Sequence, residues 1–215
     1  MPPLERAGEL FIISAPSGVG KSTLIAELLP VCPRLRFSVS STTRAPRPGE
    51  IDAKDYHFLS VEDFVQGINS GRFLEWARVH GHFYGTDRHI VEGWLDKGQD
   101  VLLDIDVQGT KLVRCAHPGA RTIFVLPPSM EVLEKRLRGR ATEGPEQLAI
   151  RIAAASREIL EAPWYDYLVV NDNLAEAVED LKAIVRACRL DRTVSAPALK
   201  SLFMSLIDPA LTPRS

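Results

Sequence analysis

The stretch Ala15-Pro16-Ser17-Gly18-Val19-Gly20-Lys21-Ser22-Thr23 lies directly after the apolar run Leu10–Ile13 and before a segment rich in helix-forming residues. It is a P-loop, the phosphate-binding pattern GxxxxGK[ST], with Ala15 in place of the usual first glycine. In a P-loop, backbone N–H groups and the positive end of the following helix surround the phosphates of a nucleoside triphosphate. The alternative is a turn with a surface lysine. The position between an apolar run and a helical segment favours the phosphate-binding loop.

Two side chains of the P-loop have further predicted roles. Lys21 can reach the β and γ phosphates of ATP, and the Ser22 hydroxyl can bind Mg²⁺. A second apolar run, Val101–Ile105, carries Asp104 and is followed by Asp106. Because a second strand often brings an acid to the magnesium shell, Asp104 is a candidate Mg²⁺ ligand through a water molecule. Asp106 is predicted to point the opposite way along the strand and to serve a different ligand.

Short apolar runs separated by helical patterns predict the fold class. Such runs suit strands that are buried on both faces of a parallel sheet, and their alternation with helices implies an α/β fold. One helix is expected over Lys21–Leu29, ending at Pro30, and another over Leu174–Cys188, with Asp172 or Asn173 as its N-cap. The expected strands are Leu10–Ile13, Val101–Ile105, Thr122–Leu126 and Tyr167–Val170.

Two stretches interrupt this alternation. Residues 40–98 are rich in glycine, aromatic and charged residues, and predict an inserted α+β subdomain with small mixed strands. Residues 138–147 are charged and lack apolar anchors, which predicts a mobile loop that can serve as a short lid. The expected organisation is a P-loop NTPase-type core at 8–39 and 99–190, the insertion at 40–98, the lid at 138–147 and a C-terminal extension at 191–215.

The composition excludes several classes of protein. The 215 residues include 26 Lys and Arg against 28 Asp and Glu, and a net charge of −2 lacks the basic excess of a dedicated nucleic-acid binder. No apolar run approaches the ~20 residues of a membrane-spanning helix. The first residues carry prolines and acids where a signal peptide would be apolar. Three widely spaced cysteines indicate neither a disulfide framework nor a zinc site. A cytoplasmic protein without nucleic-acid or membrane partners is expected.

A polar loop at the start of the insertion is a candidate phosphate site. Arg44 and Arg47 lie three residues apart in the stretch Ser40–Glu50, and Tyr56 follows. Two guanidinium groups and a phenol suit a monophosphate, because arginine binds phosphate through two parallel hydrogen bonds. From these residues alone, a solvated basic loop is an equally good interpretation.

The sequence of that loop, Ser-Ser-Thr-Thr-Arg-Ala-Pro-Arg-Pro-Gly-Glu over Ser40–Glu50, resembles the signature of the guanylate kinase family. The resemblance continues in order from about Gly8 to Leu190. It implies a P-loop nucleoside monophosphate kinase that transfers a phosphoryl group from MgATP to GMP, giving ADP and GDP. The other matching segments are Asp55–Phe58, Phe73–Ala77, Phe83–Thr86, Leu103–Gly109, Val125–Ser129 and Val170–Asp172.

The resemblance also implies a substrate site. Guanine offers O6 as an acceptor and N1–H and N2–H₂ as donors, which hydroxyl and carboxylate side chains match. Adenine would present a bare N1 acceptor to a carboxylate, so such a site should reject AMP. The alternative role for Glu75 is that of a surface acid on a helix. The implied ligands of the GMP phosphate are Arg44, Arg47, Tyr56 and Tyr84, and those of the guanine are Ser40, Glu75, Thr86 and Asp106.

A further set of implied catalytic residues is cationic. In the family, the arginines near the lid approach the transferring phosphoryl group, where positioned cations stabilise the spread charge. Each arginine could instead pair with a neighbouring acid, and Arg138 lies among them without a matching role. The family usually has glycine where this chain has Ala141, which leaves the flexibility of the lid open. The implied catalytic set is Lys21, Arg44, Arg136, Arg140 and Arg151.

Two other functions compete with this interpretation. A catalytically silent interaction module of similar fold would lack working P-loop residues, whereas Gly18, Gly20, Lys21 and Ser22 are all present. A kinase for AMP, UMP or CMP would have no use for carboxylates that accept from guanine. The expected partners are the small molecules ATP and GMP. The sequence leaves both a monomer and a homo-oligomer open.

Overall fold

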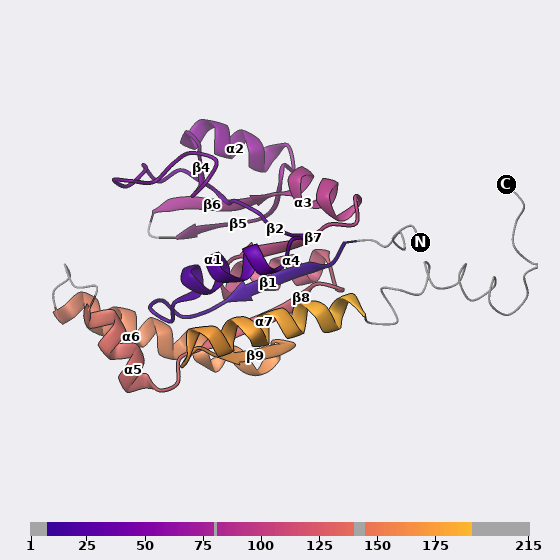
Figure 1. Ribbon diagram of the computed structural model, residues 1–215. Helices are drawn as coiled ribbons and strands as arrows, with labels where there is room; N and C mark the ends of the chain where they lie inside the picture. The colour runs from indigo at the N-terminus through magenta and orange to yellow at the C-terminus, as the bar shows by residue number, and fades with distance from the viewer. Residues whose placement is uncertain (1–7, 80, 140–144, 191–215) are drawn as a thin grey trace, which may run out of the picture.

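The computed structural model describes residues 8–79, 81–139 and 145–190. At its centre is a five-stranded sheet in the order β2-β7-β1-β8-β9, in which all neighbours are parallel (Figure 1). The four predicted strands are confirmed. The edge strand β2 was not predicted, because it is only three residues long and shows no clear alternation. The strands are β1 (Leu10–Ser14), β2 (Leu35–Phe37), β7 (Asp100–Asp104), β8 (Arg121–Leu126) and β9 (Tyr167–Val170).

Helices cover both faces of this sheet, which confirms the α/β class. Alternate residues of β1 point to opposite faces, so that Phe11 and Ile13 enter one hydrophobic core while Leu10 and Ile12 enter another. On the Phe11 face lie α1 (Lys21–Val31), α5 (Met130–Gly139), α6 (Pro145–Leu160) and α7 (Leu174–Arg189). On the Leu10 face lie α3 (Arg88–Leu95) and α4 (Val107–Ala116).

The insertion forms a second, mixed sheet in the order β4-β3-β6-β5, which lies above the core sheet in Figure 1. The ring of Phe64 on α2 stacks on Phe73 and Phe83, with centroids 4.2 and 5.3 Å apart, and this contact packs α2 against the sheet. The predicted mixed strands are therefore confirmed. The elements are β3 (Ser41–Thr42), β4 (His57–Phe58), α2 (Val61–Asn69), β5 (Phe73–Val79) and β6 (His82–Asp87).

The insertion is anchored to the core by apolar packing. Leu74 of β5 and Val91 of α3 are buried in the same cluster as Ile12 of β1 and Leu103 of β7. Fully burying one such side chain contributes roughly 1.5–3 kcal/mol. The insertion sheet therefore packs against the core through strand β5.

Two expected boundaries were wrong. Helix α1 continues through Pro30 to Val31, because a proline in the last turn costs only one backbone hydrogen bond near a helix end. Helix α5 extends to Gly139 and α6 begins at Pro145, a favoured first-turn position for proline. The described ends of the predicted lid 138–147 are therefore helical rather than loop. Residues 140–144 of that lid and the extension 191–215 lie outside the described residues.

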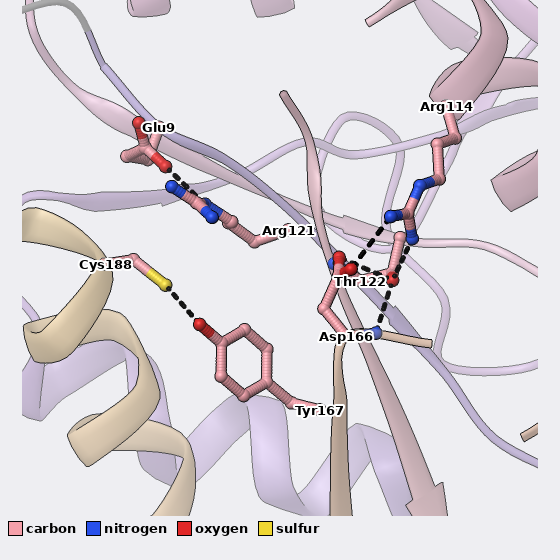
Figure 2. A network of polar contacts seen from close by, with 7 residues as sticks. All are labelled: Glu9, Arg114, Arg121, Thr122, Asp166, Tyr167 and Cys188. Atoms are coloured by element: carbon pink, nitrogen blue, oxygen red, sulfur yellow. Dashed lines mark hydrogen bonds and ion pairs between the residues drawn. The ribbon is translucent and has the colours of Figure 1, made fainter. Parts of the chain in front are cut away.

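A polar network fixes the amino-terminal ends of β8 and β9 (Figure 2). Asp166, just before β9, accepts from the Thr122 backbone N–H at 2.9 Å and from Arg114 of α4 at 2.8 Å. The Asp166 N–H in turn donates to the Thr122 hydroxyl at 3.0 Å. These bonds hold helix α4 and both strands at one point. Nearby, Arg121 pairs with Glu9 at 3.2 Å.

The cysteines differ in their exposure to solvent. Cys32 and Cys188 are buried, and Cys115 is exposed. The Tyr167 hydroxyl lies 3.3 Å from the Cys188 sulfur (Figure 2). None of the helices within the described ranges is long and apolar enough to cross a membrane.

Candidate active site

The P-loop, Ala15–Thr23, connects the end of β1 to the first turn of α1, as predicted. Gly18 and Gly20 have φ angles of 91° and 98°, a left-handed conformation that glycine adopts without strain. Gly20 is the N-cap of α1 and supplies no side-chain acceptor to the helix. The first N–H groups of α1 therefore remain available for an anion, as phosphate binding requires.

Lys21 forms an ion pair with Asp104 at the carboxyl end of β7. Both side chains, together with Asp106, line the same cavity. Asp106 lies beyond the strand as the N-cap of α4, where its Oδ1 accepts from the Gly109 N–H at 2.8 Å. The prediction that Asp106 points away from Asp104 was therefore wrong. In extended backbone, residues two apart lie on the same side.

The cavity that holds these groups encloses about 230 Å³ between the core sheet and the insertion. It receives side chains from both, so a ligand in it would contact the P-loop lysine and the insertion sheet together. Predicted substrate residues that line it are Ser40, Tyr56, Glu75, Tyr84 and Asp106; the other lining residues are Lys21, Ala77, Val79, Gly85, Asp104 and Ile105.

Glu75 lies on strand β5 and is only 6% exposed, so its interpretation as a helix-surface acid was wrong. Its Oε1 accepts from the Thr86 hydroxyl at 2.7 Å. A Cβ atom placed on Gly109 would lie 3.0 Å from Glu75 Oε2 and 3.4 Å from Asp106 Oδ1. The two carboxylates thus converge on the first turn of α4, where Gly109 leaves room for them.

The electrostatics of Glu75 follow from this burial. Loss of solvent raises the pKa of Glu75 to about 7, the negative charge of Asp106 adds to the rise, and the Thr86 hydrogen bonds oppose it. A buried carboxylate of this kind favours a ligand that donates hydrogen bonds to it. Thr86 itself uses its hydroxyl hydrogen on Glu75 and does not line the cavity.

The raised pKa of Glu75 predicts a pH-dependent loss of stability. Between its ordinary value of 4.5 and about 7, the folded protein keeps a proton that the unfolded chain releases, so the stabilisation is complete below 4.5 and lost as pH rises through 7. Glu75→Gln is always neutral. The free energy of unfolding of Glu75→Gln, relative to that of the original protein, should therefore increase by roughly 2–3 kcal/mol between about pH 5 and pH 8. Urea unfolding measures the gain, with the more exposed Glu92→Gln as control. A difference that stays constant with pH would contradict this.

Arg44 lies beside Tyr56, which lines the cavity, and is already paired with an acid. Its Nη1 and Nη2 donate to Glu50 at 3.0 and 2.8 Å, a bidentate pair, and its guanidinium is 5.3 Å from the ring centre of Tyr56. Glu50 also accepts from the Arg47 N–H at 2.7 Å. The pair raises the pKa of Arg44 and lowers that of Glu50. Arg44 is thus oriented as an oxyanion binder. The Arg47 side chain is exposed and lines neither this cavity nor the second one described below.

One arginine of α5 and one of α6 also contact the P-loop. Arg136 donates to the carbonyl oxygen of Val19 at 3.2 Å and to that of Asn171 at 3.1 Å. Asn171 donates to the same Val19 oxygen at 2.8 Å. Arg151 donates to the Ser17 hydroxyl at 2.7 Å. Both helices therefore hold the P-loop backbone or side chains in place.

The remaining residues near the predicted lid divide differently. Arg138 is exposed and pairs with Glu134 on its own helix, which is the structural alternative considered for it. Arg140 lies outside the described residues. The sequence predicts no role for Asn171, because a lone asparagine after a strand carries no chemical signal. The pairing of Glu50 with Arg44 was also not predicted. The two residues are six apart across a turn, and this spacing matches neither helix nor strand periodicity.

A second cavity, of about 410 Å³, borders the other part of the P-loop. The P-loop thus borders both cavities. Lys21 lines the smaller one and Gly18, Val19, Gly20 and Thr23 line the larger one. The other residues of the larger cavity are Arg136, Gly139, Asn171, Asp172 and Leu174.

Comparisons with known proteins match nearly the whole chain. The family model described as guanylate kinase matches residues 7–188. A guanylate kinase of Geobacter sulfurreducens is 48% identical over 195 residues, covering 90% of this chain and 96% of the relative. One of Idiomarina loihiensis is 52% identical over 184 residues, covering 85% and 88%. The crystal structure of a guanylate kinase from Anaplasma phagocytophilum gives a TM-score of 0.75 at 34% identity, covering 89% and 91%.

Proposed function

Because the chain belongs to the guanylate kinase family and transfers a phosphoryl group from ATP to GMP, we propose that the two substrates occupy two cavities that border the P-loop. The products are ADP and GDP, and the reaction belongs to purine nucleotide metabolism. GMP occupies the cavity of about 230 Å³, and ATP occupies the P-loop and the cavity of about 410 Å³. The observation that carries this assignment is the position of the P-loop. The P-loop borders both cavities, and Lys21 lines the smaller one. The phosphate of GMP and the γ phosphate of ATP would therefore meet at Lys21.

The proposed guanine site uses the carboxylates of Glu75 and Asp106 and the hydroxyl of Ser40. The carboxylates converge at Gly109 and offer acceptors to N1–H and N2–H₂ of guanine. Ser40 lines the same cavity and can donate to O6. Thr86 acts as a positioning residue, because its hydroxyl orients the Glu75 carboxylate rather than facing the cavity. Adenine would leave a buried carboxylate facing an acceptor, which is the basis of discrimination.

The proposed phosphate site uses Arg44, Arg47, Tyr56 and Tyr84. Tyr56 and Tyr84 line the cavity, and Arg44 lies beside the Tyr56 ring. The carboxylate of Glu50 now accepts two hydrogen bonds from Arg44, the same planar arrangement that a phosphate takes. GMP would bring its phosphate to this fork. Arg47, which is exposed and lies in the same loop as Arg44, would join the site once GMP is bound.

Replacing Arg44 by alanine tests the phosphate site. The variant should raise the KM for GMP about 10- to 100-fold, because charge-assisted hydrogen bonds to phosphate are worth roughly 1.5–3 kcal/mol. The KM for ATP should change little. Arg78→Ala is the matched control, since Arg78 is exposed on β5 and packs its guanidinium over Phe83. Initial rates at varied GMP measure both variants. An unaltered KM for GMP in Arg44→Ala would contradict the assignment.

Phosphoryl transfer in this site requires positioning and charge stabilisation rather than a covalent enzyme intermediate. An oxygen of the GMP phosphate attacks the γ phosphorus of ATP in line, and the bond to the β-phosphate oxygen breaks. Lys21 would exchange its carboxylate partner, Asp104, for the β and γ phosphates. Arg136 and Arg151 already bind P-loop atoms and would offer their remaining N–H groups to the transferring phosphoryl. Arg140 would act with them.

Magnesium is proposed to accompany ATP. Among the described residues there is no group of three His, Cys, Asp or Glu side chains that could enclose a metal ion, so the phosphates would supply part of its shell. The Ser22 hydroxyl and the Asp104 carboxylate, the latter through water, are hard oxygen donors of the kind Mg²⁺ prefers. Bound there, Mg²⁺ would neutralise charge on the phosphate oxygens. We propose that this chemistry takes place in the cytoplasm, where free ATP and GMP are found.

The proposed organisation treats residues 40–98 as a unit that closes on GMP against the core at 8–39 and 99–190. Both units line the substrate cavity, so closure would exclude water from ATP. Spin labels at the exposed Cys115 of α4 and at Val65→Cys on α2 would report the movement. Adding GMP with a non-hydrolysable ATP analogue should shift the distance distribution. Identical distributions with and without both ligands would rule out closure of the insertion.

A further inference from the structure

A third cavity lies outside the site described above and encloses about 440 Å³. This volume is typical of pockets that bind small molecules. None of the residues that line it lines either substrate cavity. It forms where one face of α3 meets Val39 and the segment 53–57, and we call it the α3 cavity. Its lining residues are Val39, Ala53, His57, His89, Ile90, Gly93, Trp94 and Lys97.

The described residues that line the α3 cavity provide apolar and basic groups and no acid. Ile90 and the indole ring of Trp94 are apolar, whereas His89 and Lys97 carry N–H donors. These two basic residues are exposed to solvent, and neither side chain forms a hydrogen bond or an ion pair with another residue in the described ranges. They lie eight positions apart along α3 and the turn that follows it, about two helical turns. The cavity therefore suits an anion that carries a flat apolar ring.

Gly93 leaves the middle of this helix face open. Glycine destabilises the interior of a helix relative to alanine, so its presence there needs a physical reason. At Gly67 of α2 the reason is packing, because an added Cβ atom would lie 2.8 Å from the Phe73 ring. At Gly93 an added Cβ atom would meet no atom within 4 Å. No part of the described chain fills the space beside Gly93, which is therefore available to a ligand.

The turn before β4 forms a rigid wall of the α3 cavity. Ala53 has a φ angle of 60°, in the left-handed region that disfavours side chains. Its N–H donates to the Tyr56 carbonyl oxygen at 2.8 Å, and the Ile51 N–H donates to Asp55 Oδ2 at 2.8 Å. Backbone strain that the surrounding structure maintains is frequent in segments that clamp ligands. A ligand in the cavity would therefore pack against a backbone that is already fixed.

Two short backbone segments separate the α3 cavity from the cavity proposed for GMP. Val39 lines the α3 cavity and its neighbour Ser40 lines the GMP cavity. His57 and its neighbour Tyr56 divide between the two cavities in the same way. The segments are also bonded to each other, since the His57 N–H donates to the Ser40 carbonyl oxygen at 2.9 Å. A ligand that orders Val39 and His57 would therefore order two residues on the GMP side.

We propose that the α3 cavity is an effector site for a small aromatic anion, whose binding strengthens the binding of GMP. The aromatic ring would lie over Gly93 beside Trp94, and the anionic group would pair with Lys97. The bound ligand would order the shared wall, so that Ser40 and Tyr56 lose less conformational freedom when GMP binds. The linkage rests on the proposed assignment of GMP to the neighbouring cavity.

Energy transfer from Trp94 to anilinonaphthalene sulfonate, a small aromatic anion, tests the site directly. In the double variant Trp76→Phe, Trp164→Phe, Trp94 is the last of the three tryptophans. Saturating GMP and a non-hydrolysable ATP analogue keep the probe out of the substrate cavities. Energy transfer should then saturate at one probe molecule per chain.

Two substitutions should weaken probe binding by different means. Gly93→Phe fills the α3 cavity and Lys97→Glu reverses its charge, and each should raise the dissociation constant of the probe at least about tenfold. The matched controls are Gly119→Phe, at an equally open glycine, and Lys182→Glu, both outside all three cavities. Lys97→Glu decides the test if Gly93→Phe lowers the melting temperature. Equal probe binding by the original protein and both cavity variants would overturn the proposal.

Calorimetry measures the linkage between the probe and GMP. The dissociation constant for GMP should fall about fivefold when the probe saturates the α3 cavity, and GMP should strengthen probe binding by the same factor. In Gly93→Phe the probe should leave GMP binding unchanged. An unchanged affinity of the original protein for GMP would mean that the shared wall transmits nothing, and a weaker one that the probe competes with GMP. Either result would overturn the effector role.

Glu75→Gln, measured in parallel, separates this inference from the proposed function. If Glu75→Gln leaves GMP affinity unchanged, the assignment of GMP to its cavity fails, and the linkage fails with it. If Glu75→Gln weakens GMP binding while Gly93→Phe and Lys97→Glu bind the probe as tightly as the original protein, the assignment of GMP stands and the α3 cavity is rejected as an effector site.

Discussion

Replacement of Lys21 by alanine is expected to lower kcat at least about 10³-fold, because the ammonium group is the P-loop side chain that stabilises charge on the transferring phosphoryl group. GMP binding should persist, since its proposed base ligands, Glu75 and Asp106, and its proposed phosphate ligand Arg44 are retained. A coupled assay for ADP measures kcat, and calorimetry measures GMP affinity.

Two companion variants sharpen the Lys21 prediction. Lys182→Ala removes a lysine that pairs with Glu179 on the surface of α7, and should leave kcat unchanged. Lys21→Arg keeps the charge but replaces a compact ammonium by a planar group, so it should recover only part of the activity. If Lys21→Ala retains kcat within about tenfold of the original protein, Lys21 does not have the proposed role.

Glu75→Gln is expected to reverse much of the preference for GMP over AMP. The amide nearly preserves the shape of the side chain and the bond from Thr86, but it turns an acceptor towards guanine N1–H into a possible donor. The kcat/KM for GMP should fall about 10²- to 10³-fold, because a buried donor on guanine is left unpaired. The kcat/KM for AMP should hold or rise, since adenine N1 can accept from the amide.

The measurement for Glu75→Gln is the ratio of kcat/KM for GMP to that for AMP, with Glu92→Gln as the control. Glu92 pairs with Arg88 within α3 and lies outside both cavities. Equal losses for GMP and AMP would mean that Glu75 supports the fold of the site and does not select the base.

Parts of the fold with strong local signals were predictable from the sequence. The P-loop follows from residue types at fixed spacing, and the buried strands of the core from their short apolar runs. The N-cap of α7 also follows locally, because Asn173 can accept from the N–H groups of Ala175 and Glu176, as it does. Each of these features depends on residues close together in the chain.

Features set by tertiary packing were not predictable in the same way. The burial of Glu75 depends on the pairing of β5 with β6 and on Gly109, which lies more than thirty residues away. The hydrogen bond from Asn171 to Val19 joins residues that are 152 positions apart in the chain. The predicted direction of Asp106 was wrong, because the strand was expected to continue through Asp106 and to place its side chain opposite that of Asp104. Helix α4 instead begins there.

Rates of ADP formation with GMP, AMP, UMP and CMP, each with MgATP, test the central claim most directly. The claim is that Glu75 and Asp106 select guanine in the cavity beside Lys21. Rapid, saturable turnover with GMP and rates at least about 10²-fold lower with the other three are expected. Comparable turnover with AMP, or no GMP-dependent ADP formation by folded protein, would contradict it.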